Sequence, residues 1–146
     1  MKKLLLVLSV FAMGALAAAC SQKSSGDAGG PGAEGTSQSI GVTLTDDSVT
    51  LESTSVPAGE VTFEAVNEGS ETHEIEVFEG DADPASLPIS SNVADTEGWT
   101  LVDEIEDVTP GASANLTVDL SPGTYQVVCN LPGYFEKGMY STLTVT

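Results

Sequence analysis

The stretch CNLPGYFEKGM, residues 129–139, carries the most information about this chain. A cysteine thiol opens the stretch and the thioether of Met139 closes it. Between them, Pro132-Gly133 favours a tight turn, which can bring both sulfur atoms toward one point. The only histidine of the chain, His73, opens a separate strand-like run. Thiolate, thioether and imidazole are together the donors that suit copper, so Cys129, Met139 and His73 are candidate metal ligands.

Short runs of alternating apolar and polar residues make up most of the chain from residue 40 onward. The runs lie at residues 40–45, 49–52, 61–66, 73–78, 99–105, 113–120, 124–129 and 140–145. A period of two between turn residues is the signature of β-strands. Residues 81–98 break the rhythm, and we expect a long connection there with one helical turn begun by Asp83-Pro84. About eight short strands without a long helix predict an all-β sandwich or barrel.

The segment around Cys129 resembles the ligand loop of the cupredoxins, the blue copper proteins. In that family, copper is bound by a Cys, a His five residues on, a Met five further on, and a second His from an upstream strand. Cys129 and Met139 match in identity and spacing, and His73, which follows Asn67-Glu68-Gly69, matches the upstream ligand. The resemblance spans residues 40–146. It implies a cupredoxin-like Greek-key β-sandwich that binds copper and carries electrons.

The chain departs from the family at the centre of the loop. Tyr134 stands where the family has its loop histidine. A phenol must lose a proton to bind a metal well, and its ordinary pKa is near ~10. A site of His73, Cys129 and Tyr134 could hold Cu(II) with altered colour and lower potential. If Tyr134 stays protonated, His73, Cys129 and Met139 remain, and such a set suits Cu(I).

The first residues have the pattern of an export signal. Two lysines precede an apolar run at residues 4–19, which is too short to favour a membrane-spanning helix. Ala17-Ala18-Ala19-Cys20 resembles a bacterial lipobox, although ordinary cleavage after Ala19 is an alternative. The Gly/Ser-rich residues that follow predict a flexible tether. We therefore predict a signal peptide over 1–19, a lipidated Cys20 with a linker over 20–39, and a cupredoxin-like domain over 40–146.

The chain is strongly acidic, with 22 Asp and Glu against four Lys and a formal net charge of −18. Such a field repels nucleic acid and anionic lipid surfaces, and it would attract a basic protein partner. Because the acidic residues are spread along the whole domain, a solubility role in a salty environment is the preferred interpretation.

From the sequence we predict that this protein is not an enzyme. With a single His and no second metal cluster, the chain cannot be a multicopper oxidase or nitrite reductase, and it has no phosphate-binding glycine loop. We predict an envelope-located copper protein that transfers electrons to a redox partner protein, on the outer side of the cytoplasmic membrane, in the periplasm, or secreted. Two alternatives remain: a cuprous-ion carrier or scavenger that works with a copper-handling protein, and a metal-free binding module on the same fold.

Overall fold

The computed structural model describes residues 37–146, and the predictions for the signal peptide, for Cys20 and for most of the linker lie outside these residues. The regular secondary structure of the described part consists almost wholly of strands, which confirms the all-β prediction. The strands are β1 (Gln38–Leu44), β2 (Val49–Leu51), β3 (Ser55–Val56), β4 (Gly59–Asn67), β5 (His73–Glu79), β6 (Ile89–Ser90), β7 (Val93–Ala94), β8 (Thr100–Val108), β9 (Ser113–Leu120), β10 (Gly123–Val128) and β11 (Tyr140–Val145). Two short 3-10 helices, η1 (Pro84–Ser86) and η2 (Phe135–Lys137), complete the elements of this part.

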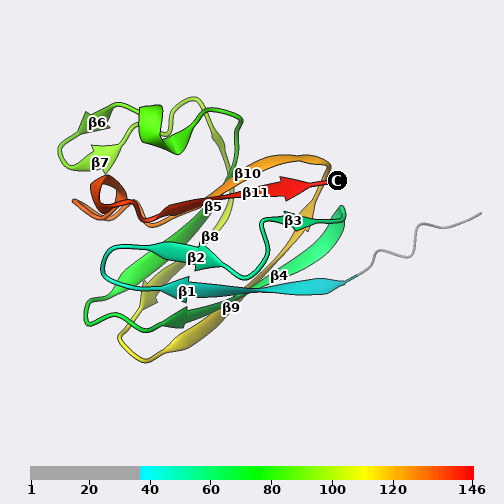
Figure 1. Ribbon diagram of the computed structural model, residues 1–146, viewed down its shortest axis with the longest axis horizontal. Coiled ribbons are helices and arrows are strands. Elements are labelled where there is room, and N and C mark those ends of the chain that lie inside the picture. Colours follow the sequence, from blue (N-terminus) through cyan, green and yellow to red (C-terminus); the bar gives the residue numbers. More distant parts are fainter. Residues whose placement is uncertain (1–36) are drawn as a thin grey trace, which may run out of the picture. The chain divides into compact units, whose positions relative to one another are not determined.

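Two sheets form the sandwich (Figure 1). One has the strand order β2-β1-β4-β9, and the other has the order β3-β11-β10-β5-β8. The chain crosses between the two sheets before and after β3, between β4 and β5, between β8 and β9, and between β9 and β10. Most pairs are antiparallel, whereas β1 runs parallel to β4 and β11 runs parallel to β3.

The core lies between the two sheets and follows the predicted alternation. Every second residue of β4 is buried at Val61, Phe63 and Ala65, and their neighbours face outward. This pattern is expected when only one face of a strand is covered, because successive side chains point to opposite faces. The strand β8 extends to Val108, three residues beyond the predicted end at residue 105, because the ladder with β5 continues to the pair His73–Val108 across a register shift.

Strand β10 is buried on both faces. Val127 packs into the sandwich core, whereas Val128 joins a second cluster with Phe78, Trp99 and Phe135. Residues 81–98, which contain η1, β6 and β7, supply the cover on this outer side. Asp83 caps η1 by accepting the Ala85 N–H at 3.0 Å, as Asp83-Pro84 predicted.

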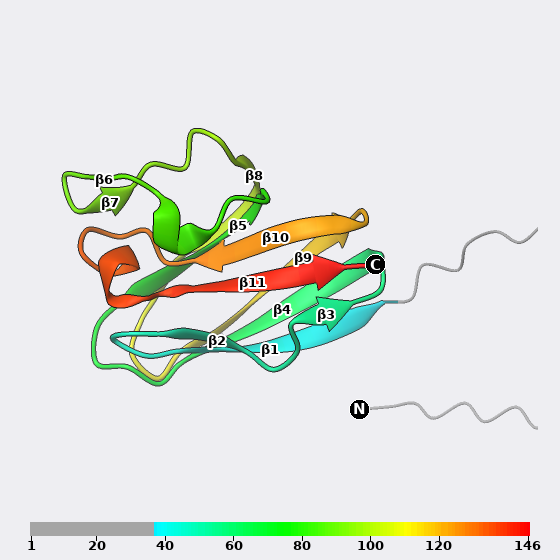
Figure 2. The ribbon, with the colours of Figure 1, turned by 45° about the horizontal axis from the view of Figure 1, so that its top comes forward.

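The segment 81–98 and the 129–139 loop lie side by side at one end of the sandwich (Figure 2). The Gly133 N–H donates to the Asn92 carbonyl at 2.7 Å, which ties the two segments together. The candidate ligands lie at this end. None of the helices in residues 37–146 has the length and apolar character needed to cross a membrane.

Candidate metal centre

His73 begins β5 and is completely buried, with an exposed fraction of 0%. The loop before it is held by Asn67, whose Nδ2 donates to the carbonyls of Glu71 and Val108, both at 2.7 Å. The Asn67 Oδ1 in turn accepts the Gly69 N–H at 2.8 Å. A buried amide that makes three hydrogen bonds to the backbone fixes the loop, and therefore fixes where the imidazole enters the core.

Cys129 directly follows β10 and lies beside this imidazole. Its Sγ is 3.8 Å from the His73 Nδ1, and the side chain is fully buried and free of any disulfide. Burial raises the pKa of the Cys129 thiol, while hydrogen bonds with the backbone of Glu74 and Leu131 act in the opposite direction. The thiol is thus protonated in the metal-free protein, and a metal that bound here would displace that proton.

Met139 precedes β11 and is also fully buried. Its carbonyl accepts the Cys129 N–H at 2.9 Å, so the backbone joins the two sulfur residues directly. The loop between them turns at Gly133 (φ 87°) and Gly138 (φ 100°), which are left-handed conformations that side-chain-bearing residues rarely adopt. The backbone of the loop therefore brings its two ends together.

Tyr134 packs against His73. The two ring centroids are 4.8 Å apart with an interplanar angle of 89°, an edge-to-face arrangement. The Lys137 ammonium lies 4.4 Å from the Tyr134 ring centroid, on the same loop. Burial raises the pKa of the Tyr134 phenol, and the charges of Glu71 and Asp46 raise it further. Tyr134 is therefore an uncharged phenol next to the imidazole.

Two carboxylates that the sequence did not mark as candidates lie at the centre: Asp46 contacts His73, and Glu74 contacts the backbone of Asn130. Asp46 lies in the turn between β1 and β2, and its Oδ1 is 3.2 Å from the His73 Nε2. Glu74 follows His73, and its Oε1 accepts the Asn130 N–H at 3.2 Å. Glu74 could have been suspected because it adjoins a candidate ligand, but no local signal marks Asp46, which is 27 residues away from His73.

Within residues 37–146, no group of three or more His, Cys, Asp or Glu side chains is placed to hold a metal ion. The pair whose donor atoms face each other at the candidate centre is His73 and Cys129, and the other candidate donors are the Met139 thioether and the Tyr134 phenol. For zinc, nitrogen and sulfur ligands lie about 2.0 and 2.3 Å from the metal, so donors of one ion are roughly 3–4 Å apart. The 3.8 Å between Nδ1 and Sγ fits this spacing.

The sequence matches the cupredoxin-like domain family over residues 9–145, which is nearly the whole chain. The chain belongs to this family. The predicted resemblance is thereby confirmed at the level of family and fold. No curated protein matches the chain.

Several solved structures have the same fold as this cupredoxin. Auracyanin from Roseiflexus castenholzii is 22% identical, with a TM-score of 0.53, and covers 76% of this chain and 97% of its own. Auracyanin B is 26% identical, with a TM-score of 0.54, over 75% of this chain and 88% of its own. Rusticyanin from Thiobacillus ferrooxidans is 18% identical, with a TM-score of 0.57, over 77% of this chain and 79% of its own.

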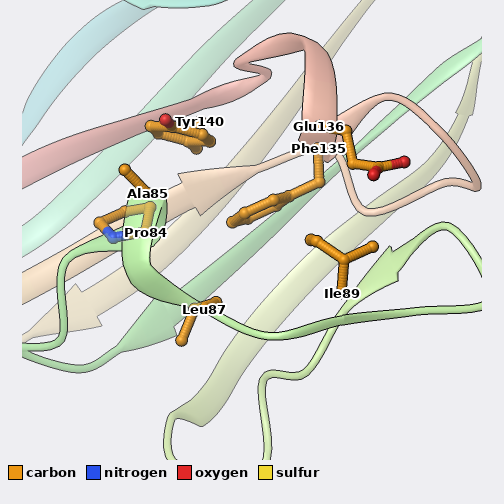
Figure 3. A pocket seen from close by; sticks show the side chains of 7 residues that line it. All are labelled: Pro84, Ala85, Leu87, Ile89, Phe135, Glu136 and Tyr140. Carbon is orange, nitrogen blue, oxygen red and sulfur yellow. The ribbon is translucent and has the colours of Figure 1, made fainter.

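The cupredoxin's segment 81–98 is hydrogen-bonded to the 129–139 loop through Asn130. The Asn130 Oδ1 accepts the Ala94 N–H at 2.8 Å, and its Nδ2 donates to the Ala94 carbonyl at 3.3 Å. An open hollow lies between η1 and η2 (Figure 3). It is lined by Pro84, Ala85, Leu87, Ile89, Phe135, Glu136 and Tyr140. The hollow is therefore next to the ligand loop and distinct from the His73–Cys129 pair.

Acidic side chains also face each other across β5 and β8. Glu76 is paired directly with Glu104, and Glu74 shares the same side of β5. Burial raises the pKa of Glu76 to about 7, and the charges of Glu74 and Glu104 add to the shift. The Glu76 Oε2 is buried without a hydrogen-bond partner. This cupredoxin therefore carries a carboxyl group that titrates near neutral pH on the strand that begins with His73.

Proposed function

We propose that this cupredoxin binds copper and transfers electrons, with an atypical centre. His73, Cys129 and Met139 supply the ligands, and Tyr134 occupies the fourth ligand position. The observation that carries the proposal is the approach of His73 Nδ1 to Cys129 Sγ at 3.8 Å, with both side chains fully buried. Copper would supply one-electron chemistry by cycling between Cu(II) and Cu(I).

The surroundings of these donors favour a rigid site. The Asn67 hydrogen bonds fix the approach to His73, and the Cys129–Met139 backbone bond closes the loop. A site whose ligands are held by packing and hydrogen bonds needs little rearrangement when the charge of the ion changes. Electron transfer alters no substrate, so we propose no enzymatic reaction.

One observation favours a second function, that of a cuprous-ion carrier. Because burial raises the pKa of Tyr134, the phenol resists the deprotonation that would make it a Cu(II) ligand. One imidazole and two sulfur donors then remain, and this soft set suits Cu(I). In this case the partner is a copper-handling protein rather than a redox protein.

Two measurements on the purified protein test both functions: the visible spectrum after addition of Cu(II), and a binding titration with Cu(I). A strong thiolate-to-copper charge-transfer band, absent from Cys129→Ser, supports the electron carrier. Stoichiometric tight binding of Cu(I) without such a band supports the cuprous-ion carrier. If neither ion binds, both copper functions are wrong, and the metal-free binding module is the function that remains.

We also propose that the protein is anchored at the cell envelope by a lipid on Cys20, with its domain on the outer side of the cytoplasmic membrane or in the periplasm. The support is the lipobox-like Ala17-Ala18-Ala19-Cys20 and the Gly/Ser-rich stretch after it. Mass spectrometry of the N-terminal peptide tests this placement. A lipid-modified Cys20 supports the anchor, whereas an unmodified peptide that starts at Cys20 indicates ordinary cleavage and secretion.

A further inference from the structure

We propose that Asp46 is a positioning residue that selects which nitrogen of His73 is available to the metal. The inference rests on the proposed copper centre and adds a residue to it. The two ring nitrogens of His73 face different partners: Nδ1 lies 3.8 Å from Cys129 Sγ, and Nε2 lies 3.2 Å from Asp46 Oδ1. A carboxylate can only accept a hydrogen bond, so it holds the proton on Nε2. The lone pair then stays on Nδ1, toward Cys129.

Asp46 is itself held in place by the loop that leads to His73. Its Oδ2 accepts the Ser70 hydroxyl at 2.6 Å, and its Oδ1 accepts the N–H groups of Ser70 at 2.9 Å and Glu71 at 3.1 Å. These bonds, that of the Ser70 hydroxyl first, lower the pKa of Asp46 to about 2. The carboxylate is therefore charged at neutral pH and anchored by groups other than the imidazole.

The fold leaves room for this contact only because residue 69 is glycine. A Cβ added to Gly69 would overlap the Asp46 Oδ1. Asp46 belongs to the β1–β2 turn of one sheet, and His73 belongs to β5 of the other, so their contact joins the two sheets at the end that carries the ligand loop. From the 129–139 loop, Lys137 Nζ donates to the Asp46 carbonyl at 3.4 Å.

A carboxylate that accepts a hydrogen bond from Nε2 makes the imidazole a stronger electron donor at Nδ1. Such partners of metal-binding histidines fix the tautomer and the ring orientation, and their loss typically lowers metal affinity about 10- to 100-fold. A more basic imidazole stabilises Cu(II) relative to Cu(I). We therefore expect Asp46 to strengthen Cu(II) binding and to lower the reduction potential of the centre.

The tautomer can be read in the metal-free protein, because His73 is the only histidine. Long-range ¹H–¹⁵N NMR at about pH 8, where an ordinary imidazole is neutral, should show the Nε2–H tautomer alone in the wild type. Asp46→Ala removes the acceptor, and we expect a mixture of tautomers. Asp46→Asn retains an acceptor oxygen and should keep Nε2–H, which would distinguish the hydrogen bond from the charge. An Nδ1–H wild type, or an unchanged tautomer in Asp46→Ala, would overturn the proposal.

Two control variants separate positioning from general stability. Asp47→Asn removes a neighbouring charge whose carboxylate bonds Thr45 and not His73. Ser70→Ala loosens the Asp46 anchor but leaves the imidazole contact intact. Both should keep the Nε2–H tautomer. If Ser70→Ala changes the tautomer as much as Asp46→Ala does, loop disorder rather than Asp46 is the cause, and the proposal is wrong.

Titration with Cu(II) alone gives the second measurement. We expect the affinity of Asp46→Ala to fall about 10- to 100-fold and that of Asp47→Asn to remain within about twofold of the wild type. Equal affinities in Asp46→Ala and the wild type would contradict the positioning role. If the wild type binds no copper, the proposed function fails, while the NMR result still decides whether Asp46 sets the tautomer.

Discussion

The edge-to-face contact between His73 and Tyr134, with centroids 4.8 Å apart, places a phenol beside the imidazole of the centre. In the cupredoxin family, a second imidazole occupies the loop position that Tyr134 holds. At the position that we propose for the fourth ligand, this chain therefore has an uncharged phenol, because burial raises the pKa of Tyr134. This relationship makes Tyr134 the most informative position to change.

Tyr134→His should produce or intensify a coloured copper site. The new imidazole needs no deprotonation to bind at neutral pH, and the other donors are already placed around it. We expect a stronger thiolate-to-copper band in the visible spectrum than in the wild type. Tyr134→Phe is the matched control and should resemble the wild type if the phenol oxygen is not a ligand. A colourless Tyr134→His protein would mean that the pocket does not accommodate a second histidine.

Glu76→Gln should stabilise the protein above about pH 7 and have little effect near the ordinary glutamate pKa of 4.5. The pKa of Glu76 is about 7 in the folded protein against 4.5 for an ordinary glutamate, so the folded state favours the protonated form. The free energy of unfolding therefore falls as the pH rises from about 4.5 to about 7, where Glu76 loses its proton in the folded state. Solvent screening reduces the effect, and we expect a gain of about 1–2 kcal/mol at about pH 8.

Urea unfolding of Glu76→Gln at about pH 4.5 and about pH 8 measures this difference. Glu64→Gln, an exposed position on β4 of the opposite sheet, is the control and should stay within about 0.5 kcal/mol of the wild type at both values. The explanation is wrong if Glu76→Gln shows the same stability change at both pH values.

Gly80→Ala should destabilise the outer cluster and expose the single tryptophan. An added Cβ at Gly80 would overlap the indole of Trp99, whereas a Cβ at Gly98 would meet nothing within 4 Å. Forcing extra volume into a packed site typically costs about 1–3 kcal/mol. We expect Gly80→Ala to lower the melting temperature and to shift Trp99 fluorescence to the red. Gly98→Ala should do neither, and equal effects in the two variants would rule out the packing explanation.

Asn130→Ala should loosen the attachment of segment 81–98 to the 129–139 loop, while the Gly133–Asn92 backbone hydrogen bond remains. The substitution removes both hydrogen bonds to the Ala94 backbone, and the Ala94 groups lose their side-chain partner. We expect a loss of about 1–3 kcal/mol and faster hydrogen exchange at Ala94. Asn115→Ala, on the exposed face of β9, is the comparison. Exchange at Ala94 that is unchanged in Asn130→Ala would show that other contacts hold the segment.

The eight longer strands and the 129–139 loop could be predicted from the order of the residues alone, because alternation and turn residues are local signals. The two-residue strands β3, β6 and β7 were not predicted, since they are too short to show a period of two. Alternation in β4 and β5 indicated which side chains enter the core, since a strand with one covered face needs an apolar residue at every second position. Cys129 and Met139 lie within one loop, so their spacing and the two loop glycines were enough to indicate a shared site.

Contacts between segments that are distant in the chain emerged only from the folded arrangement. The β1–β2 turn brings Asp46 to the outer nitrogen of His73, and the β5–β8 register places Glu76 opposite Glu104. The alternation of apolar and polar residues does not predict such pairings, because they depend on how the two sheets are stacked and on how β5 is shifted against β8. The same holds for Tyr134: its identity could be read from the sequence, but its edge-to-face position and raised pKa follow from the packing of its loop over His73.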